Sequence, residues 1–340
     1  MLLRCRWRQL AAGIGTLCAA GGLAVAWLTY EVQRPLQLQE APQRLEVPEG
    51  ASLGQLAREM EQRGWLSTAG RFGLRLYGRL SGIAGSLQTG EYAVEGGVSA
   101  YTLLQRIAAG RVIQHRLTVV EGWTFERLRE ALRSHDAVRD TLEGVEAEAV
   151  MDELGLDGEH PEGLFYPTTY RFPRGTTDRA ILRRAYRRME ERLETAWEHR
   201  QPGLPLETAY EVLILASIIE RETAREEERR RVAGVLIRRL ERGMRLQSDP
   251  SVIYGVGDTY EGRLRWSHLR NEQNPYNTYR HHGLPPTPIA LPGSASLRAA
   301  VDPEPGDALY FVSRGDGTHQ FSATLEEHNK AVRRYILEER

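Results

Sequence analysis

Two glutamates end an apolar run in the middle of the chain and are candidates for acid–base chemistry. Residues 211–223 read EVLILASIIERET. Apolar or small residues run from Val212 up to Glu220, and only Ser217 among them is polar. A helix that is apolar on all sides is normally buried, and a buried carboxylate is costly unless it is paired, hydrogen-bonded or protonated. Glu222 follows two residues later, about 200° around a helix. The two carboxylates therefore cannot share one surface.

The position of Glu220 is typical of a general acid. Cleavage of a glycosidic bond needs a donor that is still protonated near neutral pH, and burial among apolar side chains keeps a proton on a carboxyl group. The C-terminal end of a helix dipole acts in the same direction. A buried ion pair with one of the nearby arginines, such as Arg221 or Arg225, is the alternative interpretation of the same glutamate.

The first thirty residues have the pattern of a membrane anchor. Arg4, Arg6 and Arg8 precede an uncharged stretch at 9–30, and about 20 apolar residues are enough to span a bilayer. Basic residues stay on the cytoplasmic side. We expect a cytoplasmic tail at 1–8, a transmembrane helix at 9–30 in the bacterial inner membrane, and the remaining chain outside the cytoplasm. A cleaved signal peptide is the alternative.

Composition excludes several classes of function. The 340 residues include 45 basic and 46 acidic ones, a net charge of −1 that gives no case for nucleic acid as a partner. Both cysteines, Cys5 and Cys18, fall within the predicted tail and anchor, so the exported part has no thiol for a disulfide, a nucleophile or a zinc site. The adjacent histidines His281 and His282 lack the spacing of metal ligands on a helix. We therefore predict no metal and no cofactor.

The exported part divides into three segments. Residues 31–43 are predicted to be a linker, 44–115 a small β-α-α-β module, and 116–340 a mainly helical domain, which makes an α+β fold. A strand, a glycine turn and a capped helix recur three times, with Ser52, Ser99 and Thr124 as the expected N-caps. The module resembles LysM-type sugar-binding domains. A packing module that binds nothing is the alternative.

The larger domain alternates long helices with an irregular segment. We predict helices at 177–200, 207–224 and 226–242, an irregular stretch at 271–293, and a C-terminal hairpin across Gly315-Asp316-Gly317 with a last helix from 324. The charged run AREEERRR at 224–231 is interpreted as a solvated helix start with no role in the site.

Five blocks, in order, resemble the YceG-like, or MltG, family of membrane-anchored endolytic murein transglycosylases. They cover most of 116–335 and read EGLFYPTTY, LASIIERET, RLQSDPSVIYG, YNTY and GLPPTPIALPG. The resemblance places the catalytic glutamate at Glu220, with supporting or substrate-binding residues at Glu222, Gln247, Asp249, Tyr254, Asn277, Thr278 and Tyr279.

The resemblance implies one reaction and leaves two rivals. Glu220 would protonate the oxygen between N-acetylmuramic acid and N-acetylglucosamine, then take the proton of the C6 hydroxyl, which closes a 1,6-anhydro ring without water or metal. Peptidoglycan strands would be the substrate, and cell-wall synthases (penicillin-binding proteins) the partners in limiting strand length. The rivals are a lysozyme-type muramidase, with Glu220 as acid and Asp249 as nucleophile or base, and a non-catalytic murein-binding scaffold.

Overall fold

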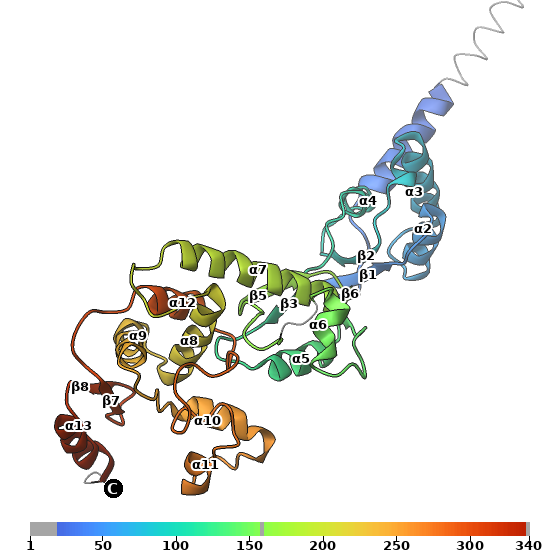
Figure 1. Ribbon diagram of the computed structural model, residues 1–340. Helices are drawn as coiled ribbons and strands as arrows, with labels where there is room; N and C mark the ends of the chain where they lie inside the picture. The colour runs from blue at the N-terminus through green and yellow to red at the C-terminus, as the bar shows by residue number, and fades with distance from the viewer. Residues whose placement is uncertain (1–18, 157–159, 338–340) are drawn as a thin grey trace, which may run out of the picture. The chain divides into compact units, whose positions relative to one another are not determined.

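The computed structural model describes residues 19–156 and 160–337, which combine helices with short strands (Figure 1). The chain divides into two compact units, Met1–His115 with Phe172–Arg174, and Arg116–Arg171 with Gly175–Arg340. The first part of the predicted transmembrane segment, residues 9–18, lies outside the described residues, as does the predicted tail at 1–8. Residues 19–33 are helical. Over the described part of the chain, no helix combines the length and the apolar character needed to cross a bilayer.

The first unit contains, besides helical residues 19–33, a two-stranded antiparallel sheet and the helices α2 to α4. Strand β1 (Gln43–Val47) pairs with β2 (Gly90–Val94), and α2 (Leu53–Gln62), α3 (Thr68–Leu80) and the short turn Ile83–Gly85 lie between them in sequence. Helix α4 (Ala100–Ala108) follows. Ser52 caps α2 with a complete capping box, and Ser99 caps α4, as predicted. The strand-helix-helix-strand order is present, while the likeness to a sugar-binding module stays a prediction.

The second unit is mainly helical. Its helices are α5 (Phe125–Arg133), α6 (Ala149–Leu154), α7 (Asp178–Glu198), α8 (Ala209–Glu222), α9 (Glu226–Glu241), α10 (Asp249–Val256), α11 (Trp266–Arg270), α12 (Ser294–Val301) and α13 (Leu325–Val332), with one-turn elements at Gly257–Thr259 and Arg333–Leu337. The remaining strands pair two by two: β3 (His115–Thr118) with β5 (Thr169–Phe172), β4 (Val138–Arg139) with β6 (Thr176–Thr177), and β7 (Tyr310–Ser313) with β8 (His319–Ser322).

Helix α8 is the core of this unit. It packs against α7, α9, α10 and α12 (Figure 1), and every residue from Val212 to Ile219 is buried. The prediction of a buried helix is therefore confirmed. The hydroxyl of Ser217, the polar residue in the run, donates to the Ile214 carbonyl at 2.7 Å and accepts the Ile289 N–H at 3.0 Å. This side chain ties the 271–293 segment to the core.

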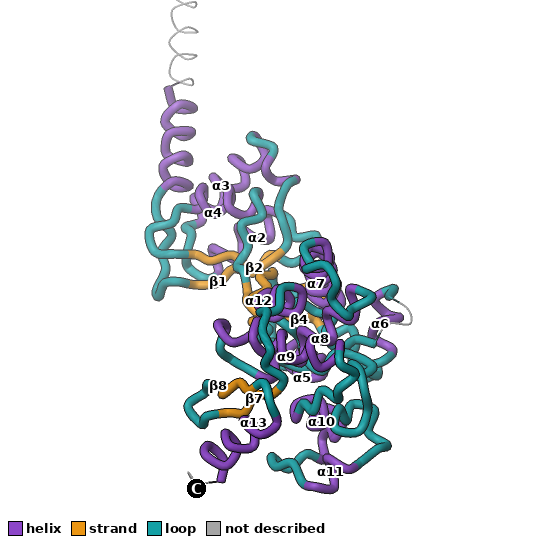
Figure 2. The backbone as a smooth tube through the Cα atoms, turned by 60° about the vertical axis from the view of Figure 1, so that its left-hand side comes forward, coloured by secondary structure: helices purple, strands orange, loops and turns teal. Residues whose placement is uncertain are grey.

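The irregular segment and the hairpin are also as predicted. Residues 271–293 contain no helix or strand, and Figure 2 shows this part of the chain as loops near α10 and α11. Strands β7 and β8 pair antiparallel across the predicted turn, from Tyr310 opposite Ser322 to Ser313 opposite His319. Thr324 then caps α13. These loops and the hairpin supply side chains around the end of α8.

Candidate functional site

The two glutamates at the end of α8 meet different parts of the protein. The helix ends at Glu222, and Thr223 follows in an extended conformation. Glu220 contacts α9 and the start of α12, whereas Glu222 contacts the start of α10. The separation expected from their spacing on a helix is present, and each carboxylate has its own surroundings.

Glu220 is enclosed, and both of its oxygens accept hydrogen bonds. Its side chain is 5% exposed; Oε1 lies 2.8 Å from Nη2 of Arg229, and Oε2 accepts the Gly293 N–H at 2.9 Å. The expectation of a carboxylate among apolar groups alone is therefore wrong, and the alternative, an ion pair with a nearby arginine, is present. Its partner is Arg229, whereas Arg221 and Arg225 donate to backbone carbonyls of other loops.

A second carboxylate, Glu121, stands beside the same arginine. Its Oε2 lies 3.8 Å from Nη2 of Arg229, and its side chain is 45% exposed. Burial raises the pKa of Glu121, the charge of Glu220 adds to the rise, and Arg229 opposes it. Two carboxylates around one guanidinium, one enclosed and one reachable from solvent, form a pair suited to holding and passing a proton.

The sequence pattern does not single out Glu121, because the glycine turn before the Thr124 cap, in which Glu121 lies, indicates only the start of a helix. The turn is fixed by two backbone hydrogen bonds to the 291 region: the Gly122 N–H donates to the Leu291 carbonyl at 2.9 Å, and the Leu291 N–H donates to the Trp123 carbonyl at 2.7 Å. Buried Glu162 accepts the Phe125 N–H at the first turn of α5. Burial raises the pKa of Glu162 to about 7. Segments far apart in the sequence thus position Glu121.

Replacing Gly293 with alanine tests the contribution of Glu121. A Cβ atom at Gly293 would lie 1.8 Å from Oε1 of Glu121, so the carboxylate must move away. The backbone of Gly293 has φ −84°, which alanine adopts freely. We expect a folded Gly293→Ala protein whose catalytic rate is reduced about tenfold or more, with a Gly293→Ala/Glu121→Ala protein assayed beside it. If the single variant keeps the wild-type rate, Glu121 has no part in the reaction.

Glu222 faces a large cavity. The cavity has a volume of about 580 Å³, within the range of ligand pockets. Oε1 of Glu222 accepts the Ser248 hydroxyl at 2.5 Å, and Oδ1 of Asp249 accepts the Tyr279 hydroxyl at 2.7 Å. The polar lining comprises Glu222, Arg239, Gln247, Asp249, Tyr279, Tyr310, Ser313, His319, His328 and Asn329. Four predicted site residues, Glu222, Gln247, Asp249 and Tyr279, therefore line one cavity, and Glu220 is not among its lining residues.

The surroundings of Glu222 make it a weaker acid than a free glutamate. Burial raises its pKa from 4.5 to about 7; the Asp249 charge adds to the rise, while Ser248 and Arg239 oppose it. The folded protein therefore holds a proton that the unfolded chain releases between pH 4.5 and about 7. Over that window the free energy of unfolding falls as the pH rises, because the folded state binds more protons.

A Glu222→Gln protein should lack this loss of stability. We expect its free energy of unfolding to exceed that of the wild type by about 1–3 kcal/mol near pH 8 and to differ little near pH 5. Urea denaturation at both pH values measures the difference. A difference of the same size at both pH values would contradict the proposed proton uptake.

Gln247 is held in a strained conformation at the cavity wall. Its φ is +54°, the one positive value recorded for a non-glycine residue in the described chain. Its N–H donates to the Thr278 carbonyl at 3.1 Å, and its Oε1 accepts from Nη1 of Arg239 at 3.1 Å. Such backbone strain costs about 1–3 kcal/mol and occurs preferentially at functional sites.

Besides Glu220, three predicted site residues do not line this cavity. Asn277 is fully buried, and its amide donates to backbone carbonyls around α11. Thr278 is buried as well, and its hydroxyl accepts the Ser248 N–H at 2.8 Å. Tyr254 packs edge-on against Tyr276, with ring centroids 4.8 Å apart. Asn277 and Thr278 therefore fix the loop that carries Tyr279, and the expectation that they line the cleft is wrong.

The charged run at 224–231 is a solvated helix start at most of its residues, as expected, but the expectation that it has no role in the site is wrong. Arg229 is buried and pairs with Glu220. Glu228 is buried too, and it accepts the His319 N–H at 3.0 Å and lies 2.7 Å from Nδ1 of His319. One face of the first turns of α9 thus joins α8 to the hairpin.

The adjacent histidines His281 and His282 contact backbone carbonyl groups. His281 lies 3.0 Å from the Glu272 carbonyl, and His282 lies 2.9 Å from the Gly243 carbonyl. Within the described ranges no group of three or more histidine, cysteine, aspartate or glutamate residues is arranged to hold a metal ion.

Comparison with known proteins gives consistent matches. The model of the YceG-like family matches residues 45–334. A protein of Bacillus subtilis named endolytic murein transglycosylase is 27% identical over 310 residues, which are 86% of this chain and 84% of that protein. A protein of the same name from Streptococcus pneumoniae is 24% identical over 325 residues, 85% of this chain and 58% of that protein. The crystal structure of a putative YceG-like protein from Listeria monocytogenes has a TM-score of 0.51 and 27% identity, and the match covers 85% of this chain and 98% of that one.

Proposed function

Because the chain belongs to the YceG-like family, we propose that it is an endolytic murein transglycosylase, a lyase that cuts peptidoglycan glycan strands internally. It cleaves the bond between N-acetylmuramic acid and N-acetylglucosamine and leaves 1,6-anhydro ends. The name that the Bacillus subtilis and Streptococcus pneumoniae relatives carry supports the reaction class. The acid–base site at the end of α8 supports the chemistry.

One observation carries the assignment of the catalytic group. Glu220 is 5% exposed, held by Arg229 and the Gly293 N–H, and accompanied by Glu121 at the same guanidinium. An acid that acts twice, first as donor and then as acceptor, must return to the same position between the two steps. The two fixed donors supply that position.

The proton comes from the carboxylate pair. Burial and the Glu220 charge raise the pKa of Glu121, so Glu121 retains a proton more readily than an isolated glutamate would. Glu220 delivers a proton to the glycosidic oxygen as the bond to C1 breaks. As carboxylate it then accepts the proton of the C6 hydroxyl, whose oxygen bonds to C1. Atoms and charge balance without water.

The cavity favours a second candidate reaction. Glu222, with a pKa of about 7, and Asp249 line the same space and interact electrostatically. An acid and a carboxylate with differently tuned surroundings are the pair that a hydrolase of the lysozyme type uses. In that case Glu222 would be the acid in place of Glu220, and a water molecule would enter the product.

Product mass separates the two reactions. The full-length protein in detergent is incubated with purified, uncross-linked glycan strands, and the fragments are weighed. We expect internal fragments whose new reducing ends are one water lighter than hydrolysis products. Fragments with ordinary reducing ends would establish the hydrolase, and no cleavage at all would leave a murein-binding scaffold.

The location of the enzyme is part of the proposal. Arg4, Arg6 and Arg8 before the uncharged stretch 9–30 support an anchor in the bacterial inner membrane, with the remaining chain outside the cytoplasm. There the enzyme would meet strands made by penicillin-binding proteins and limit their length, and the LysM-like module would contact glycan. Protease added to spheroplasts should remove the chain beyond residue 31, and complete protection would refute this orientation.

A further inference from the structure

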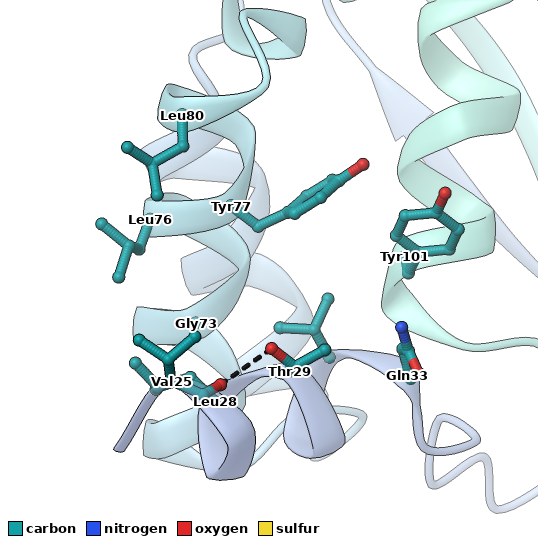
Figure 3. Close-up of a pocket in the computed structure, with 10 residues that line it drawn as sticks. Val25, Leu28, Thr29, Gln33, Gly73, Leu76, Tyr77, Leu80 and Tyr101 are labelled. Carbon is teal, nitrogen blue, oxygen red and sulfur yellow. Dashed lines mark hydrogen bonds between the residues drawn. The ribbon is translucent and has the colours of Figure 1, made fainter. Parts of the chain in front are cut away.

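Two hollows of opposite character adjoin on helix α3. One, of about 260 Å³, is lined mainly by apolar side chains of helical residues 19–33 and of α3, including Val25, Leu28, Leu76 and Leu80. Figure 3 shows Leu76 and Leu80 on one side of α3, and Tyr77 on the other side facing Tyr101. The other hollow, of about 500 Å³, lies between α2 and α3. Leu76 lines both of them.

The second hollow is basic. Arg58 of α2 and Arg75 and Arg79 of α3 line it, and all three are exposed. Neighbouring arginines have acidic partners, such as Arg71 with Glu61. By contrast, no acidic side chain of the described chain pairs with Arg58, Arg75 or Arg79. Three guanidinium groups around one space, without a carboxylate, are complementary to an anion such as a phosphate ester.

The apolar residues beside these arginines are unusually exposed. Phe72 is 61% exposed, Leu76 37% and Leu80 80%. At 100° per residue, Arg75, Arg79, Phe72, Leu76 and Leu80 follow one another around a continuous arc of about 140° of α3. Arginines next to large apolar side chains on one helix are the pattern of a helix that lies in a membrane interface.

The neighbouring helix has the same exposed apolar character. Helical residues 19–33 pack against α3 at Gly73, where an added Cβ would lie 2.9 Å from Cγ2 of Val32. Val25 and Trp27 of that helix are 61% and 54% exposed. The apolar surface therefore continues from one helix to the other, and sugar hydroxyls would find few polar partners on it.

We propose that this face binds an anionic phospholipid bilayer, with the phosphate headgroups in the arginine hollow and the acyl chains against Phe72, Leu76 and Leu80. Charge and shape together indicate this ligand. A cationic hollow without acidic partners and an apolar hollow share one wall, which matches the anionic headgroup and the acyl chains of a phospholipid. This contact is separate from the catalytic site and does not depend on the proposed reaction.

A fluorophore at position 76 reports the contact. In the full-length chain Cys5 and Cys18 are replaced by serine, and Leu76→Cys is labelled with an environment-sensitive dye. The protein is placed in nanodiscs of phosphatidylcholine, with or without phosphatidylglycerol, that carry a lipid-borne quencher. A Glu46→Cys label on β1 is the matched control, because Glu46 is exposed in the same unit.

We expect blue-shifted, quenched emission from position 76 in discs that contain phosphatidylglycerol, and unchanged emission from position 46. Each arginine near an anionic surface contributes about fivefold to binding, so Arg58→Gln/Arg75→Gln/Arg79→Gln should reduce the quenching at least fivefold. Arg183→Gln/Arg184→Gln/Arg187→Gln, which removes the same charge from exposed positions of α7, should not change it. Equal quenching without phosphatidylglycerol or in the first triple variant would overturn the proposal, as would a shift produced by lipid-free glycan strands.

Discussion

A Glu220→Gln protein should bind glycan strands and release cut ends about 10²–10⁴ times more slowly than the wild type, the usual contribution of a general acid–base group. The amide keeps the shape of the side chain and can still accept a hydrogen bond from Gly293. It cannot deliver a proton or take one back. Mass analysis of the products against time, together with a strand-binding assay, measures both properties.

Glu222→Gln is the matched control, since it makes the same change two residues later on α8. It should retain most of the activity if Glu220 is the acid. The opposite pattern, with Glu220→Gln active and Glu222→Gln inactive, would move the chemistry into the cavity with Asp249. Circular dichroism must accompany both assays to confirm folding. The Glu220→Gln change removes the carboxylate that pairs with the buried Arg229 guanidinium.

Replacing Arg229 with methionine should be the most destabilising of these changes. The guanidinium is 8% exposed and the Glu220 side chain 5%, so the variant leaves an enclosed carboxylate without its partner. Removing one member of a buried ion pair costs about 3–5 kcal/mol. Urea denaturation near pH 7 should show a loss of that size in the free energy of unfolding.

The double variant Arg229→Met/Glu220→Gln distinguishes an unpaired charge from lost packing. If the charge is the cause, the second substitution should recover at least half of the lost stability, because no ionised group then remains unpaired. If the losses in the free energy of unfolding from the two substitutions simply add, Arg229 acts through packing. Arg229 would then not be a guanidinium shared by Glu121 and Glu220.

Local patterns were sufficient to predict the elements that carry the site. The apolar run from Val212 to Ile219 predicted a buried helix, and Ser52, Ser99 and Thr124 cap the helices that follow them. These features depend on neighbours within one or two turns, which the sequence displays directly. The hairpin across Gly315-Asp316-Gly317 is predictable for the same reason.

The partners of the glutamate could not be predicted in this way. The nearest arginines in sequence, Arg221 and Arg225, point elsewhere, while Arg229 reaches Glu220 from the next helix. Glu121 arrives from about a hundred residues upstream, through a turn fixed by backbone hydrogen bonds to Leu291. Contacts of this kind depend on how helices pack, and no spacing rule encodes them.

A polar residue type is also a poor guide to whether a side chain faces a ligand. Asn277 and Thr278 are polar, and sequence reasoning placed them in the cleft. Both are buried, and they satisfy backbone groups of an irregular loop that would otherwise lack partners. A long segment without regular structure needs such side chains to hold its own shape, and that need produces the same residue types as substrate binding.

The cavity beside α8 takes part of its wall from β7, β8 and α13, so residues as late as Ile336 contribute to it. A ribosome must therefore pass residue 336 before that space can close. Products of interrupted translation or of proteolysis that end before β7 would lack this wall of the cavity while keeping both glutamates. The cavity is thus completed only after both glutamates have been synthesised.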